Sequence, residues 1–393
     1  MTDLINPSEY PTKSTEEFPP WPLACDTWDH KELDAMKEVM ASGMFTCGEK
    51  VARFEEVFCS TFGYKYAVMV NSGSSANLLM VAAAFEMGWL KRGDKVIVPA
   101  VGWSTSYFPF MQYGLELVFV DVEADTWNID PSLVDMAITP DVKAVLGINL
   151  LGNPCTFGRL QSICDEHKLL LLEDNCESMG SAYDSVYCGG IGKMGTFSTF
   201  FSHHIQTMEG GIIVTADEEL YHTLKSLRSH GWTRDTKWFS GEPFEFLTMG
   251  YNVRPGELNG AIGIVQLDKF DYFESMRNKN ASVFIEHFGD HKDWNIQQVS
   301  DKGAHSWFGF GLVFKSEELR DKARAMLVEN NVGVRPIVTG NFTNQPVMAR
   351  MSWEGGPFPI ADTLDRQGLF MGNNPQDLTE IIELTAANFK ARL

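Results

Sequence analysis

Between residues 66 and 215, short runs of consecutive apolar residues alternate with segments that have a helical pattern. The apolar runs, each predicted to form a strand, are 67–70, 95–98, 117–120, 142–151, 169–172 and 211–214. The helical patterns between them include residues 76–88 and 157–167. Strands that are apolar along their whole length are buried on both faces, and helices cover those faces. The order therefore predicts an α/β fold with a mainly parallel sheet.

The pattern changes after residue 263. Residues 264–288 predict one long helix, and the segments that follow predict a smaller α+β unit. We therefore expect an N-terminal segment (1–40), a large domain (41–270) and a small C-terminal domain (271–393).

Composition and charge narrow the class of protein. Of 393 residues, 44% are hydrophobic and 21% are charged, as in ordinary globular chains. The net charge of −20 argues against nucleic acid or an anionic membrane as the main partner. The start of the chain lacks the pattern of a signal peptide, and no apolar run reaches the length of about 18 residues that predicts a membrane span. Residues 8–20 are predicted to be disordered.

The cysteines indicate the compartment. There are seven, an odd number, and no two have C-x-x-C spacing. Free thiols in a reducing, cytoplasmic environment fit this pattern best.

Three segments that follow predicted strands carry candidate chemistry. Residues 71–77, Asn-Ser-Gly-Ser-Ser-Ala-Asn, could cradle a phosphate at a helix N-terminus, or could simply cap that helix. Asp174 could pair with a cationic ring nitrogen or cap the next helix. Trp103 could stack on a flat ligand ring or pack at the rim of the core. The residues alone leave these alternatives open.

Two further motifs are less informative than they look. Residues 190–195 match G-x-G-x-x-G, but a strand-like run follows them where a dinucleotide site needs a helix, so we expect no such site. His203 and His204 are adjacent, and neighbouring side chains in an extended segment point to opposite faces. No H-E-x-x-H motif or Cys/His cluster accompanies them, so we expect no metal.

Several ordered motifs together resemble one family over almost the whole chain: the sugar aminotransferases of the DegT/DnrJ/EryC1/StrS family, which use pyridoxal phosphate and have the aspartate-aminotransferase-like fold (fold type I). The motifs are residues 42–48, 54–56, 71–75, 172–174, 197–200 and 250–261. The resemblance implies that Asp174 binds the ring nitrogen of the cofactor and that Trp103 stacks on its ring. Glu177 lies where the family usually has Gln or His near the 3-hydroxyl of the ring.

The resemblance also implies how the phosphate of the cofactor is held. Ser72, Gly73, Ser74 and Ser198 would surround it, and Asn252 would reach it from the other subunit of a homodimer. The nucleotide-sugar substrates of the family carry a diphosphate, which arginines can bind. Candidates for that role are Arg234, Arg254 and Arg335.

The main departure from the family lies at His203. In the aminotransferases, a lysine six residues before the Glu of the E-G-G turn holds the cofactor covalently. Counting back from Glu209 leads to His203, and neither Lys193 nor Lys225 is an obvious replacement. An imidazole cannot form that link, but it can move a proton near neutral pH. This change resembles a branch of nucleotide-sugar 3-dehydratases; His204 is expected to be structural.

The branch suggests a reaction. L-Glutamate would convert pyridoxal phosphate to pyridoxamine phosphate, and His203 would move the protons as the C3 hydroxyl leaves. The substrate implied is a GDP-linked 4-keto-6-deoxy-D-mannose; the products are ammonia, 2-oxoglutarate and a 3-deoxy-4-keto sugar for deoxysugar (colitose-type) lipopolysaccharide biosynthesis. No cysteine follows Cys188, so the iron–sulfur cluster of one relative type is not expected.

Two other functions remain open. The chain could be a nucleotide-sugar 4-aminotransferase that uses another lysine, or a non-catalytic protein that binds the cofactor or a nucleotide sugar. A binder would not need a carboxylate for the ring nitrogen, so retention of Asp174 with Trp103, Ser198 and Asn252 favours an enzyme.

Overall fold

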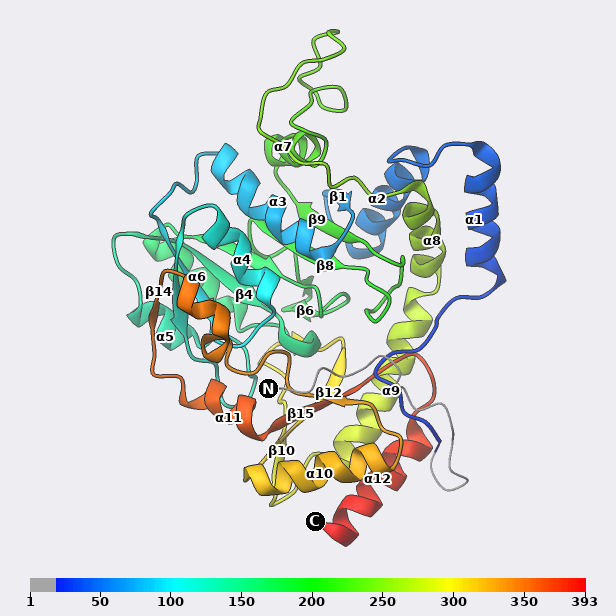
Figure 1. Cartoon of the computed structure of the whole chain (residues 1–393), viewed down its shortest axis with the longest axis vertical. Coiled ribbons are helices and arrows are strands. Elements are labelled where there is room, and N and C mark those ends of the chain that lie inside the picture. The colour runs from blue at the N-terminus through cyan, green and yellow to red at the C-terminus, as the bar shows by residue number, and fades with distance from the viewer. Residues whose placement is uncertain (1–18) are drawn as a thin grey trace.

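An eight-stranded sheet lies at the centre of the computed structural model, which describes residues 19–393 (Figure 1). Its order is β1-β9-β8-β5-β4-β2-β3-β14. The strands are β1 (Tyr66–Val70), β2 (Lys95–Pro99), β3 (Glu116–Val120), β4 (Val142–Ile148), β5 (Leu170–Asp174), β8 (Met194–Ser198), β9 (Gly211–Thr215) and β14 (Trp353–Gly355). All neighbours are parallel except those of β9. The predicted α/β fold with a mainly parallel sheet is confirmed.

The strands are apolar along their length because both faces of the sheet are covered. In β2, Val96 and Val98 contribute to one hydrophobic cluster and Ile97 to another. Successive side chains of a strand point to opposite faces, so each face has its own core. The first core is shared with α3 (Gly73–Glu86), α4 (Ser104–Gln112) and α7 (Glu218–Arg228). The opposite face packs on α2 (Glu49–Phe62), α5 (Pro131–Met136) and α6 (Phe157–His167).

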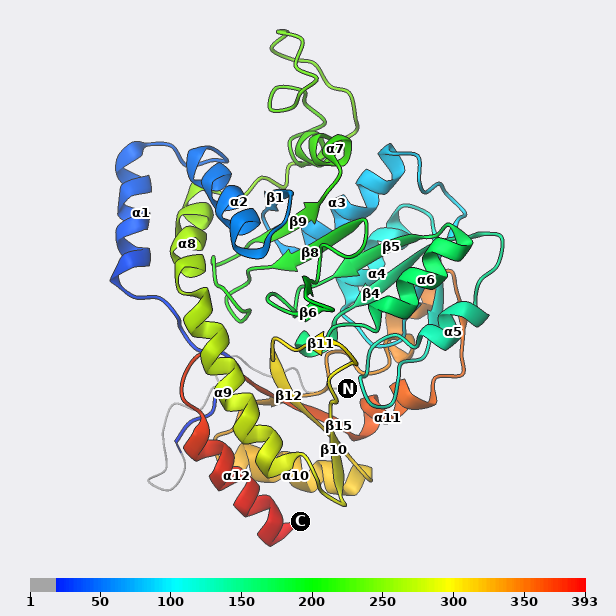
Figure 2. The ribbon, with the colours of Figure 1, turned by 180° about the vertical axis from the view of Figure 1, so that it is seen from behind.

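A second, antiparallel sheet lies near the C-terminus, with the order β10-β12-β15-β13 (Figure 2). Its strands are β10 (Trp294–Ile296), β12 (Gly309–Phe314), β13 (Val334–Arg335) and β15 (Gly368–Gly372). It shares a core with α9 (Phe270–Phe288), α10 (Glu317–Glu329) and α12 (Thr379–Arg392). A small third sheet joins β6 (Ala182–Tyr183), β7 (Val186–Tyr187) and β11 (Gly303–Ala304).

The C-terminal part of the chain also returns to the large sheet. β14 pairs with β3, and Phe342 and Leu364 lie in the core of the large sheet. The elements of this return are η3 (Phe342–Asn344), η4 (Pro346–Arg350) and α11 (Pro359–Gln367). The division of the chain at residue 270 stays a prediction.

The long helix predicted over residues 264–288 is wrong at one point. The structure has two helices there, α8 (Glu257–Asp268) and α9, and Lys269 separates them. The backbone N–H of Lys269 bonds to the carbonyl of Gln266, a tighter turn than that of an α-helix, and the chain changes direction there.

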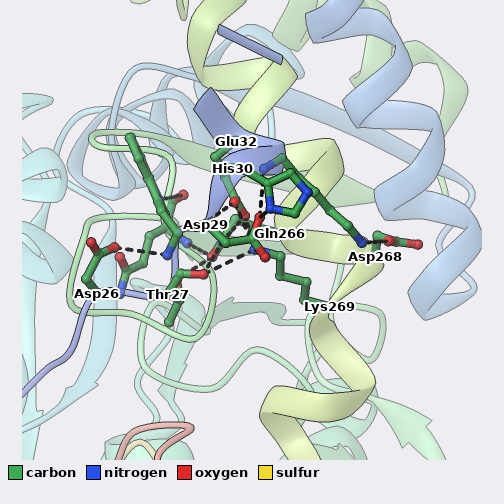
Figure 3. Close-up of polar contacts among 11 residues, drawn as sticks. Asp26, Thr27, Asp29, His30, Glu32, Gln266, Asp268 and Lys269 are labelled. Atoms are coloured by element: carbon green, nitrogen blue, oxygen red, sulfur yellow. Dashed lines mark hydrogen bonds and ion pairs between the residues drawn. The ribbon is translucent and has the colours of Figure 1, made fainter. Parts of the chain in front are cut away.

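The N-terminal segment is attached at the junction of α8 and α9 (Figure 3). The carboxylate of Glu32, on α1 (His30–Ser42), is fully buried and lies 2.7 Å from Lys269 Nζ. Gln266 Nε2 donates to the same carboxylate at 2.6 Å. A buried ion pair of this kind depends on such additional hydrogen bonds. Residues 1–18, which include the start of the chain, where no signal peptide is expected, and most of the segment 8–20 predicted to be disordered, lie outside the described residues.

The connection after α7, residues 229–256, is bonded to the body of the molecule at both ends, and its middle part projects away as a loop (Figures 1 and 2). It exposes several large apolar side chains, among them Phe244 and Met249. Within residues 19–393, no helix has both the length and the apolar character that a membrane crossing requires.

Candidate active site

The turn between β1 and α3 has the form of an anion cradle. Ser72 caps α3, its Oγ accepting from Ser75 N at 3.1 Å, and the backbone N–H groups of the first turn of the helix point out of its end. A Cβ atom on Gly73 would lie 2.7 Å from Ser198 Cβ, so only glycine lets the helix approach the end of β8. Ser74 is exposed and donates to Thr105 Oγ1 at 3.0 Å. The predicted phosphate residues Ser72, Gly73, Ser74 and Ser198 therefore lie together.

Asp174 is buried at the carboxyl end of β5, with 4% of its surface exposed. Its Oδ2 accepts from Ser106 Oγ at 2.6 Å and from Asn77 Nδ2 at 2.8 Å, and its Oδ1 accepts from Cys176 N at 3.0 Å. Among the described residues it has no ion pair with a cationic side chain. A buried carboxylate that is surrounded by donors but lacks a cation is suited to a protonated ring nitrogen.

Trp103 is close in sequence to residues that contact both the cradle and Asp174. It immediately precedes α4, and 55% of its surface is exposed. In the first turn of that helix, Thr105 contacts Ser74 and Ser106 contacts Asp174. An exposed indole at this position is available to cover a flat ring held between the two groups.

Glu177 is partly buried and approaches the backbone of η2 (Leu150–Gly152), where its Oε2 accepts from Leu151 N at 3.0 Å. Burial, and secondarily the charge of Asp174, raise the pKa of Glu177 to about 7. The carboxyl can therefore be protonated near neutral pH, when it can donate a hydrogen bond as the usual glutamine does.

His203 and His204 have different surroundings, although they are adjacent. His204 is 2% exposed, and its Nε2 lies 3.1 Å from the carbonyl oxygen of Ser306. His203 is partly exposed, its ring lies 5.2 Å from that of Phe308, and its Nδ1 has no hydrogen-bond partner among the described residues. Burial, and then the charge of Arg277, lower the pKa of His203 to about 4, so that its imidazole is neutral at pH 7.

His203 lies in the connection from β8 to β9, which begins directly after Ser198. Phe308, which contacts its ring, donates its backbone N–H to Leu151 O at 2.9 Å. Leu151 is the residue that bonds Glu177. Through these contacts the structure brings the histidine, the carboxyl of Glu177 and the end of β8 into one region.

The candidate residues for binding from another subunit and for the nucleotide lie apart from one another; Asn252 is the candidate for the cofactor phosphate, and the arginines are the candidates for the nucleotide. Asn252 is exposed, one residue before Val253, whose carbonyl accepts from Asn71 N at 3.0 Å beside the cradle. Arg234 is exposed in the projecting loop, where its guanidinium lies 4.1 Å from the ring centre of Trp232 and also pairs with Asp235. An exposed residue is free to bind across a subunit boundary.

The remaining arginines are closer to the centre. Arg254 is partly buried beyond Val253, and Arg335 is exposed on β13. The segment after Arg335 contacts the loop of Trp103, because Thr339 Oγ1 donates to Gly102 O at 2.7 Å. Within residues 19–393, no hydrogen bond links Arg234, Arg254 and Arg335 to one another.

Sequence reasoning missed the partners of Asp174. Asn77 and Ser106 both bond it, and Asn77 is itself oriented by Thr196, whose Oγ1 donates to Asn77 Oδ1 at 2.6 Å. Ser106 lies three residues after Trp103, in the first turn of a helix that follows a strand end, and this position could have predicted that its side chain reaches the site. Arg277 carried no such signal.

The geometry fits pyridoxal phosphate: a cradle for its phosphate, an exposed indole for its ring and a buried carboxylate for its nitrogen. These features and the fold define the class of protein, a fold type I enzyme that uses pyridoxal phosphate. Residues 26–383 match the model of the DegT/DnrJ/EryC1/StrS aminotransferase family, and the chain belongs to that family. The predicted aspartate-aminotransferase-like fold is confirmed.

Individual relatives are more specific. The chain is 48% identical over 380 residues to GDP-4-keto-6-deoxy-D-mannose 3-dehydratase of Yersinia pseudotuberculosis, covering 92% of this chain and 96% of that protein. A crystal structure of GDP-4-keto-6-deoxymannose-3-dehydratase with a trapped PLP–glutamate geminal diamine is 46% identical, with a TM-score of 0.89 and coverage of 93% and 99%. A histidine-to-asparagine mutant of such an enzyme with bound GDP-perosamine has a TM-score of 0.90 at 46% identity, with coverage of 94% and 100%.

Proposed function

We propose that this chain is a glutamate-dependent 3-dehydratase that uses pyridoxal phosphate and acts on a nucleotide-linked 4-keto-6-deoxy sugar, GDP-4-keto-6-deoxy-D-mannose. One observation carries the proposal: the chain has the anion cradle, the exposed indole and the buried carboxylate that suit the cofactor, but the residue at the lysine position is His203. The relatives that are 46–48% identical are named for this reaction and this substrate. The glutamate adduct of one relative supports L-glutamate as the amino donor.

When bound, the cofactor supplies an electron sink and an amine that condenses with the sugar ketone. The chain supplies the groups around it. Asp174 keeps the ring nitrogen protonated, Trp103 covers the ring, and Glu177 offers a hydrogen bond to the ring hydroxyl. The α3 N-terminus with Ser72, Gly73, Ser74 and Ser198 binds the phosphate.

His203 moves the protons. Its imidazole is neutral at pH 7, and no partner fixes its Nδ1, so it can accept a proton and return it. It takes a proton from the cofactor side and delivers one to the departing C3 hydroxyl. Because it cannot bond covalently to the cofactor, it would not displace the nitrogen from the sugar, and hydrolysis by water would release that nitrogen as ammonia and leave a ketone. A lysine at this position would favour an amino sugar.

The remaining assignments concern partners. Asn252 reaches the cofactor phosphate of the other subunit in a homodimer, and Arg234, Arg254 and Arg335 bind the diphosphate of the nucleotide sugar. Their separation within one chain is consistent with a site that is completed by a second copy. We place the enzyme in the cytoplasm, where the nucleotide sugar and glutamate are available.

One assay separates the three functions. The protein is incubated with pyridoxal phosphate, L-glutamate and GDP-4-keto-6-deoxy-D-mannose, and ammonia, 2-oxoglutarate and the mass of the sugar are measured. Ammonia with a sugar that has lost one oxygen atom supports the dehydratase. A 4-amino sugar would indicate the aminotransferase, and no turnover would indicate a binding protein.

The role of His203 is tested with His203→Asn. Ammonia release should be lost while the cofactor still binds, as measured by absorbance titration. His287→Asn is the control, because His287 contacts Glu383 on the outside of α9 and should leave the rate unchanged. Unimpaired ammonia release by His203→Asn would remove the proposed role.

A further inference from the structure

Arg277, on α9, is a buried cation without a matching anion. Only 3% of its surface is exposed, and none of the ion pairs among residues 19–393 includes it. Its Nη1 donates to the carbonyl oxygens of Trp307 at 3.3 Å, Phe308 at 3.4 Å and Asn373. Removing a guanidinium from water costs several kcal/mol unless a partner compensates, so the presence of this charge needs an explanation.

The backbone that Arg277 holds is also the wall of the histidine pair. The carbonyl of Ser306 lies 3.1 Å from His204 Nε2. The ring of Phe308 lies 5.2 Å from the ring of His203 and 5.8 Å from that of His204. Residues 306–308 therefore contact Arg277 on one side and both imidazoles on the other.

The same wall is tied to the rest of the site. Phe308 N donates to Leu151 O, and Ser306 N donates to Gly152 O at 3.0 Å. Asn373, a second anchor of Arg277, donates its Nδ2 to the carbonyl of Trp307 at 2.9 Å. A shift of the guanidinium would be transmitted to the side chains that line His203 through one short, well-bonded segment.

We propose that Arg277 is a positioning residue for His203: its guanidinium binds the carbonyl oxygens of Trp307 and Phe308 and so anchors residues 306–308 against the histidine pair. The importance of this role for the reaction rests on the proposed function. A base must be unprotonated before it can remove a proton, so a cation near His203 favours the reactive form.

The electrostatic surroundings agree with this role. After burial, the charge of Arg277 is the main influence that lowers the pKa of both His203 and His204. His204 also faces His203 and His305, which are themselves neutral when buried. Glu274 of α9 lines the same small cavity as His204 and Arg277, and burial raises its pKa. Cys25 faces Arg277 from the N-terminal segment, and burial raises the pKa of its thiol to about 11.

A purely structural role would also make Arg277 important for stability, so the test needs a measurement that structure alone does not change. The full chain without added substrate is labelled with 13C-histidine, and the imidazole signals are followed by NMR from about pH 3.5, below the pKa of about 4 of His203, to pH 8. His203→Asn identifies the signal of His203. Three variants are compared with the wild type: Arg277→Lys keeps the charge, Arg277→Gln keeps hydrogen-bond donors without charge, and Arg277→Met keeps neither.

The wild type and Arg277→Lys should titrate His203 with the same midpoint, below about pH 5, whereas in Arg277→Gln the midpoint should lie measurably higher because one of the two influences that lower the pKa is removed. The acid limb of kcat against pH should move upward with it, while KM changes little. Arg53→Met is the control, since Arg53 is exposed and, within residues 19–393, pairs with Glu56 alone. If Arg277→Met does not fold, the Lys and Gln variants decide the question.

The proposal is overturned if Arg277→Gln leaves the titration of His203 where the wild type has it. It is also overturned if Lys and Gln shift the midpoint equally, because the charge is then irrelevant. The titration uses no sugar nucleotide, so its outcome is independent of whether the proposed dehydratase activity is found.

Discussion

Replacing Asp174 by asparagine tests the centre of the site, because the substitution keeps the shape of the side chain and removes its charge. Asn77 must point its Nδ2 at residue 174, since its Oδ1 is occupied by Thr196 Oγ1. The oxygen of the new amide therefore has to face Asn77 and Ser106, and its NH2 group has to face Cys176 N–H, now at 3.0 Å. One buried donor loses its acceptor, so the free energy of unfolding should fall by about 1–3 kcal/mol.

The effect on the cofactor should be larger than the effect on the fold. Truncating one partner of a buried, hydrogen-bonded charge pair costs about 2–5 kcal/mol. We therefore expect Asp174→Asn to weaken pyridoxal phosphate binding, or the rate of ammonia release, by roughly 30- to 5000-fold. Urea unfolding measures the stability, absorbance titration measures the affinity for the cofactor, and a coupled ammonia assay measures the rate.

Asp121 provides a matched control. It is also 4% exposed, and its carboxylate also accepts three hydrogen bonds, but these come from backbone N–H groups at Val122, Ile360 and Ala361. Asp121→Asn should lower stability by a similar amount and leave the activity of the folded enzyme unchanged. If Asp174→Asn binds the cofactor and releases ammonia like the wild type, the carboxylate does not act on the ring nitrogen.

Three other predictions follow from single contacts. Because the pKa of Glu177 is raised to about 7, the folded state retains a proton that the unfolded state has lost. Raising the pH from about 4.5 to about 7 should therefore lower the free energy of unfolding by up to roughly 3 kcal/mol. Urea unfolding of Glu177→Gln should lack this pH-dependent component, and the same pH dependence in the variant as in the wild type would contradict the prediction. Gly73→Ala should place a Cβ 2.7 Å from that of Ser198, costing about 1–3 kcal/mol and weakening cofactor binding in the absorbance titration, whereas wild-type affinity would show that the cradle tolerates the methyl group. Glu257→Ala removes the carboxylate that accepts from three backbone N–H groups around the start of α2, at 2.7–3.0 Å. The free energy of unfolding, measured in urea, should fall by roughly 3 kcal/mol. A loss under about 1 kcal/mol would mean that water replaces the carboxylate.

Local pattern predicted the large sheet well. Strands that are buried on both faces are mostly apolar, so β1 to β5 stand out as apolar runs, and Asp174 stands out as a polar residue at the carboxyl end of one of them. The ordered motifs and the count from Glu209 to His203 needed no tertiary information, because the family fixes their spacing along the chain. The apolar pattern wrongly predicted one helix across Lys269, because the helical pattern continues there although the structure has two separate helices, α8 and α9.

Only the tertiary structure decided which side chains surround these residues. Asn77 and Ser106 reach Asp174 across 97 and 68 residues of sequence, β14 joins the large sheet from the C-terminal part, and Arg277 approaches His203 through a wall of backbone. Such contacts depend on where distant elements pack and leave no periodic trace in the chain. The sequence by itself determined which residue stands at the lysine position; the fold determined that its imidazole packs against Phe308, which Arg277 holds from the other side, and that its pKa is lowered to about 4.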